Sequence, residues 1–256
     1  MQSYTTVTEV PGSRVTAEQL AMFCTRYRLA ADLSKGKDVL EVACGPGIGL
    51  GYLGRHARRV VGGDYDEVLL GYARATYGNG IRVLRLDAGA LPFASQSFEV
   101  VILLEALYYL DSPEQVIEES RRVLRPEGTL VISIPNRDWP GFNPSPFTHR
   151  YFSVPALHTL LASKGFATRI SGGFPVSRAT PRDRLLTAAR RLAVRLHLIP
   201  STMKGKELVK RLVFGTLSSL PHELRDGMAE PSPLVPLAAS SPTSAFKVLY
   251  AVGRLP

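Results

Sequence analysis

The chain has 256 residues, two cysteines, a net charge of +9 and 45% hydrophobic residues. This length suits one α/β domain with a full core and room for an insertion. No apolar stretch approaches the roughly 20 residues that span a bilayer. The first twelve residues lack the pattern of a signal peptide, so we expect a cytoplasmic protein. Cys24 and Cys44 fit neither a disulfide framework nor a metal site, so we expect no bound metal.

The basic excess is compatible with nucleic acid, an anionic membrane surface or an acidic small molecule as a partner. Aromatic residues do not alternate with the basic ones as they do on surfaces that bind single strands. The sequence also shows no recognisable RNA-binding module. Nucleic acid is therefore a disfavoured partner, and the sequence leaves the oligomeric state open.

The first part of the chain alternates between helical patterns and short apolar runs. Apolar residues at helical spacing predict a helix over Val15–Asp32. Strands are expected in KGKDVLEVACG, RRVVGGDYD, IRVLRLDAGALPF, SFEVVILLEALYYL and Gly128–Ile134, with helices between them, one capped by Ser112. Such alternation predicts βαβ units, and hence a parallel sheet with helices on both faces.

After Asn136 the pattern changes to a loop rich in proline and aromatic residues. A helix is predicted to follow Ser153, which is a suitable N-cap. Two further strands are predicted in ATRISGGFPV and AFKVLYAVGR. About seventy residues separate these two strands, which is too long for an idle loop.

The predicted carboxyl ends of the first strands carry glycines and acids. Ligands of parallel sheets bind beyond these ends. Gly45 and Gly47 allow a tight turn and a close approach of a ligand to the backbone. Leu50 occupies the place of the third glycine of the dinucleotide pattern, which weakens a pyrophosphate site. The ends also offer carboxylates for an amine, a ribose and an adenine, so an adenosyl amino acid fits better than a dinucleotide.

Five segments, VLEVACGPG, VVGGDYD, LDAGALPF, SFEVVILLEALYYL and VLRPEGTLVISIPN, resemble in order and spacing the motifs of class I S-adenosylmethionine-dependent methyltransferases of the type 11 kind. The resemblance covers about Phe23 to Asn136. It implies a Rossmann-like α/β fold with a seven-stranded, mostly parallel sheet, helices on both faces and a helical insertion before the last strand. It also implies S-adenosyl-L-methionine as cofactor and S-adenosyl-L-homocysteine as product.

The resemblance further implies which residues bind the cofactor. Tyr27 would cover it, Glu41 would bind the methionine amino group, and Gly45 and Gly47 would pack against methionine and ribose. Asp64 would hold the ribose hydroxyls, with Tyr65 beside the adenine. Asp87 and Ala88 would contact the adenine edge, and the backbone of Leu103 and Leu104 would lie near the sulfonium.

Catalysis by such a site depends mainly on alignment, because the methyl donor is already activated. If the acceptor is a hydroxyl, a base tuned near neutral pH helps, and His149 is the first candidate by residue type. Tyr109 stands where family members often have histidine. With an ordinary pKa of about 10 it is a poor base, although it can hydrogen-bond the substrate. Glu105 fits a structural role better than a catalytic one.

The predicted domains are a cofactor-binding domain over 1–174, a helical cap over 175–243 that closes the acceptor pocket, and a final strand over 244–256. Within the cap, Pro181–His197 predicts an amphipathic helix with a leucine face and a face carrying Arg184, Arg191 and Arg195. This helix is interpreted as a lid, or else as an interfacial helix on an anionic membrane.

These observations lead to a prediction of function with alternatives. We expect an S-adenosylmethionine-dependent methyltransferase of small molecules, such as a secondary metabolite or a glycosylated compound. The alternatives are a lipid or quinone methyltransferase at a membrane surface, a non-catalytic module that binds the nucleoside, and a nicotinamide oxidoreductase. The last is disfavoured by Glu41 and by the interrupted glycine pattern.

Overall fold

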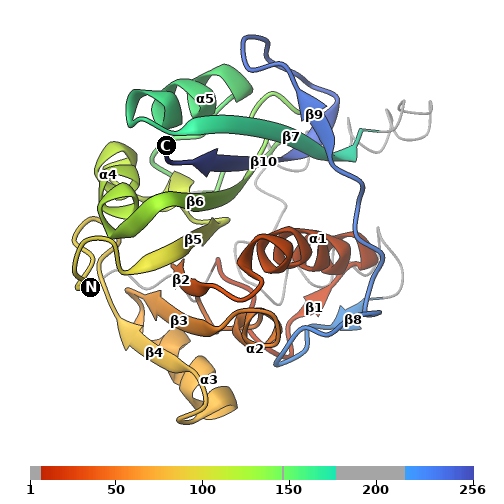
Figure 1. Cartoon of the computed structure of the whole chain (residues 1–256). Coiled ribbons are helices and arrows are strands. Elements are labelled where there is room, and N and C mark those ends of the chain that lie inside the picture. The colour runs from red at the N-terminus through yellow and green to blue at the C-terminus, as the bar shows by residue number, and fades with distance from the viewer. Residues whose placement is uncertain (1–6, 146, 177–216) are drawn as a thin grey trace.

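An eight-stranded sheet forms the centre of the computed structural model, which describes residues 7–145, 147–176 and 217–256 (Figure 1). The strand order is β4-β3-β2-β5-β6-β10-β7-β9. The strands β2 to β6 pair in parallel, whereas β10 pairs antiparallel with β6 and with β7. The strand bounds are β2 (Asp38–Val42), β3 (Arg59–Asp64), β4 (Arg82–Arg85), β5 (Phe98–Leu104), β6 (Leu124–Pro135), β7 (Ala167–Pro175), β9 (Val235–Leu237) and β10 (Phe246–Arg254).

Helices cover both faces of this sheet, so the expected α/β fold class is confirmed. The helices α1 (Ala17–Ser34), α2 (Leu50–Gly54) and α3 (Glu67–Tyr77) contribute to the core on one face. The helices α4 (Pro113–Val123) and α5 (Val154–Ser163) pack on the other. Side-chain caps begin three of them: Thr16 forms a capping box with Gln19, and Asp66 and Ser153 accept backbone N–H bonds.

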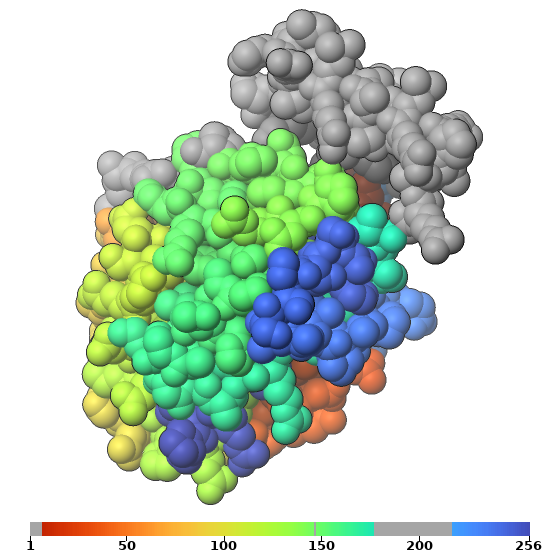
Figure 2. All heavy atoms as spheres, turned by 90° about the horizontal axis from the view of Figure 1, so that it is seen from above, coloured from red at the N-terminus to blue at the C-terminus, as the bar shows by residue number. Residues whose placement is uncertain are grey.

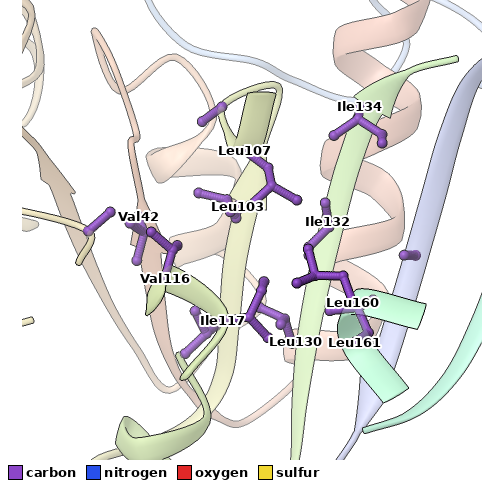
Figure 3. Packing of buried hydrophobic residues seen from close by; sticks show 14 of the residues in the cluster. Val42, Leu103, Leu107, Val116, Ile117, Leu130, Ile132, Ile134, Leu160 and Leu161 are labelled. Carbon is purple, nitrogen blue, oxygen red and sulfur yellow. The ribbon is translucent and has the colours of Figure 1, made fainter. Parts of the chain in front are cut away.

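The core on the α4 and α5 face joins the strands to the short 3₁₀ helix η1 (Leu107–Tyr109), as Figure 3 shows. Leu103, Leu107, Ile117 and Leu130 are fully buried there. All five residues of β2 are buried as well, because helices cover both of its faces. This packing fixes the carboxyl ends of β2 and β5 next to each other.

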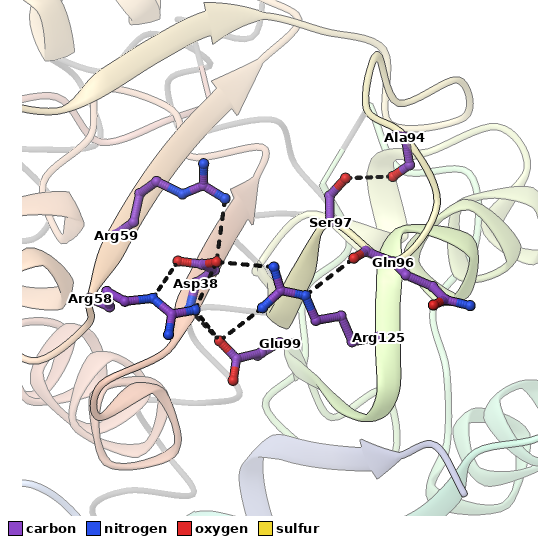
Figure 4. Close-up of polar contacts among 8 residues, drawn as sticks. All are labelled: Asp38, Arg58, Arg59, Ala94, Gln96, Ser97, Glu99 and Arg125. Atoms are coloured by element: carbon purple, nitrogen blue, oxygen red, sulfur yellow. Dashed lines mark hydrogen bonds and ion pairs between the residues drawn. The ribbon is translucent and has the colours of Figure 1, made fainter.

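Charged residues gather at the opposite, amino-terminal edge of the sheet (Figure 4). Arg58 donates through Nε to Asp38 Oδ1 at 3.0 Å and through a terminal nitrogen to Glu99 Oε2 at 2.8 Å. Arg125 donates to Asp38 Oδ2 at 3.2 Å, and Arg59 lies 3.5 Å from the same oxygen. These guanidinium groups hold the pKa of the Asp38 carboxyl below its ordinary value.

The segment before the last strand differs from the expectation. Residues 217–243 contain the strands β8 (Ser218–Ser219) and β9 and no helix, so the helical insertion is wrong for this part of the chain. Its prolines, Pro221, Pro231, Pro233, Pro236 and Pro242, explain why, because proline breaks helices. The strand β9 joins β7 and gives the sheet one strand more than expected. The predicted basic helix 181–197 lies outside the described residues.

The described part of this segment lies across the molecule rather than over the strand ends. The strand β8 pairs with β1 (Arg14–Val15), ahead of α1. Leu220 and Leu224 are buried in the core on the α1 side, and the Leu224 N–H donates to the Ile48 carbonyl at 2.9 Å. In Figure 2, the blue residues of this segment lie against teal and green residues, which come earlier in the chain. The segment therefore braces the glycine turn from outside.

Candidate functional site

A cavity of about 850 Å³ opens at the carboxyl ends of the parallel strands. Its wall combines α1, the turn after β2 and the ends of β3 and β5 with residues of β10. Of the described residues 217–243, none lines it, so the expected cap over this cavity is not formed by that segment. The size is suitable for a small ligand with a second molecule beside it.

The glycine turn is tied to the end of β3. Gly45 lines the cavity with a φ of +55°, a left-handed conformation that glycine adopts without strain. Its N–H donates to Asp64 Oδ2 at 2.8 Å, and the Asp66 N–H donates to Asp64 Oδ1 at 2.8 Å. Asp64 is 7% exposed, and burial raises the pKa of its carboxyl. The glycine turn and Asp64, the residue predicted to hold the ribose hydroxyls, are therefore bonded to each other.

The other glycines of the turn fit against helices. A Cβ on Gly47 would lie 2.8 Å from Ala73 of α3, so Gly47 stands behind the cavity wall rather than in it. A Cβ on Gly49 would lie 1.9 Å from the Tyr27 ring. Because no such Cβ can be accommodated without moving the ring, Gly49 is what allows Tyr27 to reach the turn. The sequence pattern Gly45, Gly47, Gly49 thus reflects packing as well as ligand approach.

Tyr27 and Glu41 form a buried pair beneath this turn. The Tyr27 hydroxyl donates to Glu41 Oε1 at 2.6 Å, while Glu41 Oε2 has no hydrogen-bond partner among the described residues. Burial raises the pKa of Glu41 to about 7, although the Tyr27 bond and the nearby Arg26 charge lower it. Tyr27 lines the cavity. Glu41 does not line it and lies behind Tyr27, to which it is hydrogen-bonded. One carboxylate oxygen therefore remains available to a donor.

The far side of the cavity combines an exposed tyrosine ring with apolar residues. Tyr65 lines it with 44% of its surface exposed, and the Arg85 guanidinium lies 5.0 Å from its ring centre. Asp87 Oδ1 accepts the Gly89 N–H at 2.8 Å, and Ala88 lies beside it. The apolar residues Leu69 and Leu86 complete this side. A planar ring would find one polar edge and apolar faces here.

The end of β5 bears two predicted backbone contacts and an acid. Leu104 lines the cavity, whereas Leu103 is fully buried in the core behind it. Glu105 follows with a φ of +56° and also lines the cavity. Its Oε1 accepts the Ser133 hydroxyl at 2.9 Å, and its Oε2 accepts the Tyr108 hydroxyl at 3.3 Å. A non-glycine residue in this backbone region is strained, and such strain is concentrated at functional sites.

The two predicted catalytic residues lie in different surroundings. Tyr109 lines the cavity with its ring centre 4.4 Å from that of Tyr108, and burial raises its pKa. It therefore remains a protonated donor. His149 does not line the cavity: its Nε2 lies 2.9 Å from Asp111 Oδ1, and its side chain is 46% exposed. The structure thus brings Tyr109, but not His149, to the cavity wall.

Two residues of the site were not predicted from the sequence. Arg26 of α1 lines the cavity with its guanidinium 3.8 Å from the Phe23 ring centre, and its Nε has no hydrogen-bond partner among the described residues. Tyr250 of β10 also lines the cavity, and its buried hydroxyl is likewise unpartnered. For Arg26, the one indication in the sequence is its position next to Tyr27, a predicted cofactor-binding residue. Tyr250 lies in the continuous apolar run Val248–Ala251 of its strand and is indistinguishable from a core residue by sequence.

Neither a metal cluster nor a membrane span is found in the part of the chain that the structure describes. Its histidine, cysteine, aspartate and glutamate side chains form no group of three that could hold a metal ion. Its helices are all too short or too polar to cross a bilayer.

Comparison with known proteins shows what the domain around this cavity is similar to. Residues 40–132 match the family model described as a methyltransferase domain. A probable S-adenosylmethionine-dependent methyltransferase of Mycolicibacterium smegmatis is 35% identical over 146 residues, which are 55% of this chain and 56% of the relative. The chain thus spans about half the length of the first curated relatives it matches.

Two further relatives carry more specific names. The phthiotriol/phenolphthiotriol dimycocerosates methyltransferase 1 of Mycobacterium ulcerans is 37% identical over 38% of this chain and 37% of its own. The O-methyltransferase resE of Aspergillus sclerotiorum is 29% identical over 62% and 66%. The solved structure of a methyltransferase from Thermotoga maritima has a TM-score of 0.59 at 15% identity and covers 91% of this chain and 89% of its own, so the fold is shared.

Proposed function

We propose that this chain, whose residues 40–132 match the model of a methyltransferase domain, is a class I methyltransferase that transfers a methyl group from S-adenosylmethionine to a small-molecule acceptor. The observation that carries the proposal is that Gly45 and Asp64 line one cavity, with Glu41 behind it and bonded to the lining residue Tyr27. Leu50 stands where the dinucleotide pattern has its third glycine, and the carboxylates disfavour a phosphate ligand.

The nucleoside half of the cofactor fits the Asp64 side of the cavity. Each Asp64 oxygen accepts one backbone N–H and retains lone pairs for the ribose hydroxyls. The adenine would lie against Tyr65, with its edge at Asp87 and Ala88. The apolar residues Leu69 and Leu86 would contact its faces.

The amino-acid half fits the α1 side. Glu41 Oε2, the unpartnered oxygen, would accept from the amino group, and Tyr27 would cover the methionine chain. The unpartnered Arg26 Nε would donate to the carboxylate. Gly47 and Leu103 would support the site from behind, and Leu104 would contribute backbone near the sulfur.

When bound, the cofactor supplies an activated methyl group. The chain's own task is to bind the acceptor in line with that group and to exclude water. Tyr109 would serve as a hydrogen-bond donor to the acceptor because its raised pKa keeps it protonated. His149 remains a candidate base that would have to enter the cavity from its loop.

The acceptor itself is proposed at the level of class. We favour a small molecule such as a secondary metabolite, and the phthiotriol-related relative favours a lipid as the second candidate. A lipid acceptor would give a role to the predicted basic helix 181–197 at a membrane surface. The cytoplasmic location and the cofactor-binding domain over 1–174 are part of the same proposal, whereas a non-catalytic binding module is its main rival.

The test uses methyl-labelled S-adenosylmethionine. The protein is incubated with this compound and a cell extract separated into small polar metabolites, lipids, RNA and protein. We expect label in the small-molecule fraction, whereas label in lipid supports the second candidate. Calorimetry with S-adenosylhomocysteine runs in parallel. Binding without any transfer favours the non-catalytic module, and absence of binding overturns the proposal.

A further inference from the structure

Three polar residues lie side by side where β5, β6 and β10 meet the cavity. Tyr250 of β10 is the direct antiparallel partner of Ser133 of β6. Because directly paired residues point to the same face of a sheet, their side chains are neighbours. The Ser133 hydroxyl donates to Glu105 Oε1, and the Glu105 N–H donates to the Ser133 carbonyl at 2.9 Å. Glu105 and Tyr250 therefore flank one stretch of the cavity wall.

Glu105 has the properties of a proton acceptor. It lines the cavity in a strained backbone conformation, and burial raises the pKa of its carboxyl. The groups that face it from other elements are Arg26, Ser133, Tyr108 and Glu9. The first three lower its pKa and Glu9 raises it. Such a carboxylate, once ionised, is a stronger base than an exposed one.

The Tyr250 hydroxyl is a hydrogen-bond donor without an acceptor among the described residues. Its side chain is 2% exposed, and its hydroxyl has no hydrogen-bond partner among the described residues. Burial raises the pKa of this phenol, and the Glu105 charge adds to the effect, so it stays protonated. A buried donor left unpaired is costly, and a ligand atom that accepts from it removes that cost.

We propose that the methyl acceptor is a hydroxyl group, held between the Tyr250 hydroxyl as donor and the Glu105 carboxylate as acceptor, and that Glu105 takes its proton. This inference rests on the proposed function. In the step, the acceptor oxygen forms a bond to the methyl carbon, and the methyl–sulfur bond breaks with its electron pair left on sulfur. The hydroxyl proton passes to Glu105, so charge and atoms balance.

A hydroxyl matches these residues better than an ammonium group does. It can accept from Tyr250 and donate to Glu105 at once, which an ammonium cannot do because it has no lone pair. Glu105 would then be a catalytic residue, and Ser133 a positioning residue that acts through it.

The first test identifies the bond that carries the label. The probe is the extract fraction that wild-type protein labels from methyl-labelled S-adenosylmethionine, treated afterwards with hot hydriodic acid, which releases methyl groups from ether oxygen. We expect the label to be released as methyl iodide. Label retained on nitrogen or carbon overturns the hydroxyl assignment.

The second test uses variants of the two flanking residues. Glu105→Gln should lower the labelling rate about a hundredfold, the size of a general-base contribution. Tyr250→Phe should lower it about fivefold, the size of one neutral hydrogen bond. Tyr52→Phe is the matched control, since the Tyr52 hydroxyl donates to Asp226 at 2.8 Å outside this cavity. Its labelling rate should equal that of wild type, as should the affinity of all three variants for S-adenosylhomocysteine.

The pH profile separates a proton acceptor from a structural residue. The wild-type rate should fall as the pH drops through the Glu105 pKa, because only the carboxylate accepts a proton. Ser133→Ala removes a bond that lowers this pKa and should move the acidic limb to higher pH. The same profile in wild type and Ser133→Ala overturns the role of Glu105, even if Glu105→Gln fails to fold. Binding of S-adenosylhomocysteine with no transfer in wild type instead fails the transferase proposal, and this inference with it.

Discussion

The acidic residues at the two ends of β2 have opposite surroundings and opposite pKa shifts. Asp38, at the amino end, lies among three arginines that hold its pKa below the ordinary value. Glu41, three residues further on, is fully buried with one tyrosine hydroxyl, and burial raises its pKa to about 7. Asp64 and Glu105 at the carboxyl ends also have raised pKa values, and burial is the largest cause for both.

The difference distinguishes acids that stabilise the fold from acids kept for a ligand. A carboxylate surrounded by guanidinium groups has its lone pairs occupied and nothing left to offer a ligand. A buried carboxylate with an unpartnered oxygen destabilises the unliganded protein, and a bound ligand reverses that cost. The comparison therefore predicts opposite responses to substitution and to pH at the two ends of one strand.

The largest expected effect is that of Glu41→Gln on stability. The rise of the pKa from 4.5 to about 7 corresponds to about 3 kcal/mol of unfavourable ionisation. The folded protein binds this proton more tightly, so stability falls as the pH rises between these values. The variant should be more stable than wild type by about this amount at pH 8 and no more stable at pH 4, measured by urea unfolding without ligand. Equal stability at both pH values would contradict the assignment.

Tyr27→Phe should have the next largest effect, in the opposite direction. It removes the hydroxyl that stabilises the ionised Glu41, and a hydrogen bond to a charged group contributes about 2 kcal/mol. The loss should be clear at pH 8 and small at pH 4, where Glu41 is protonated. Introduced into Glu41→Gln, the same change should cost less. An equal cost in both backgrounds would show that the two residues are not coupled.

Asp64→Ala should weaken S-adenosylhomocysteine binding about tenfold or more, or about 1.4 kcal/mol. It removes the carboxylate proposed for the ribose and the acceptor of the Gly45 N–H. Calorimetry on the folded variant measures the change, and Asp66→Asn provides a control at the adjacent helix cap. Unchanged affinity in a folded Asp64→Ala protein would exclude Asp64 from the site.

Asp38→Asn should have the smallest effect. Its arginine partners are more than a third exposed, so water screens the pairs and the loss should be about 1 kcal/mol. Because the folded pKa of Asp38 lies below its ordinary 3.8, its stabilising effect is present above that value and lost as the pH falls through the folded pKa. Urea unfolding at pH 7 and at pH 2 should show the gap between variant and wild type closing in acid. The gap has the opposite sign to that of Glu41→Gln, because here the variant is the less stable protein.

Local patterns explain why much of the fold could be predicted from the sequence. Buried runs such as that of β2 and caps such as Ser153 depend on neighbouring residues, so α1, α3 and the central strands lie where the patterns indicate. The helix α2 has only five residues, Leu50–Gly54, since glycines surround it. The strands β8 and β9 were missed because they are two and three residues long and are defined by partners far along the chain.

The residues of the site likewise divide into those that the sequence predicts and those that it does not. The residues of the glycine turn and of the strand ends follow from motifs, and most of them line the cavity. Arg26 and Tyr250 could not be predicted, because α1 and β10 bring them together across more than two hundred residues. The unpartnered state of Tyr250 is a property of its three-dimensional neighbours, and no periodicity along the strand records it.

The position of β10 also has a consequence for synthesis on the ribosome. This strand inserts between β6 and β7, which precede it by many residues (Figure 1). Until Phe246–Arg254 has left the ribosome, β6 and β7 lack the strand that joins them, and their unpaired backbone groups invite association with other chains. The same strand brings Tyr250 to the cavity. A nascent chain therefore completes its sheet and its proposed acceptor site in a single, late event.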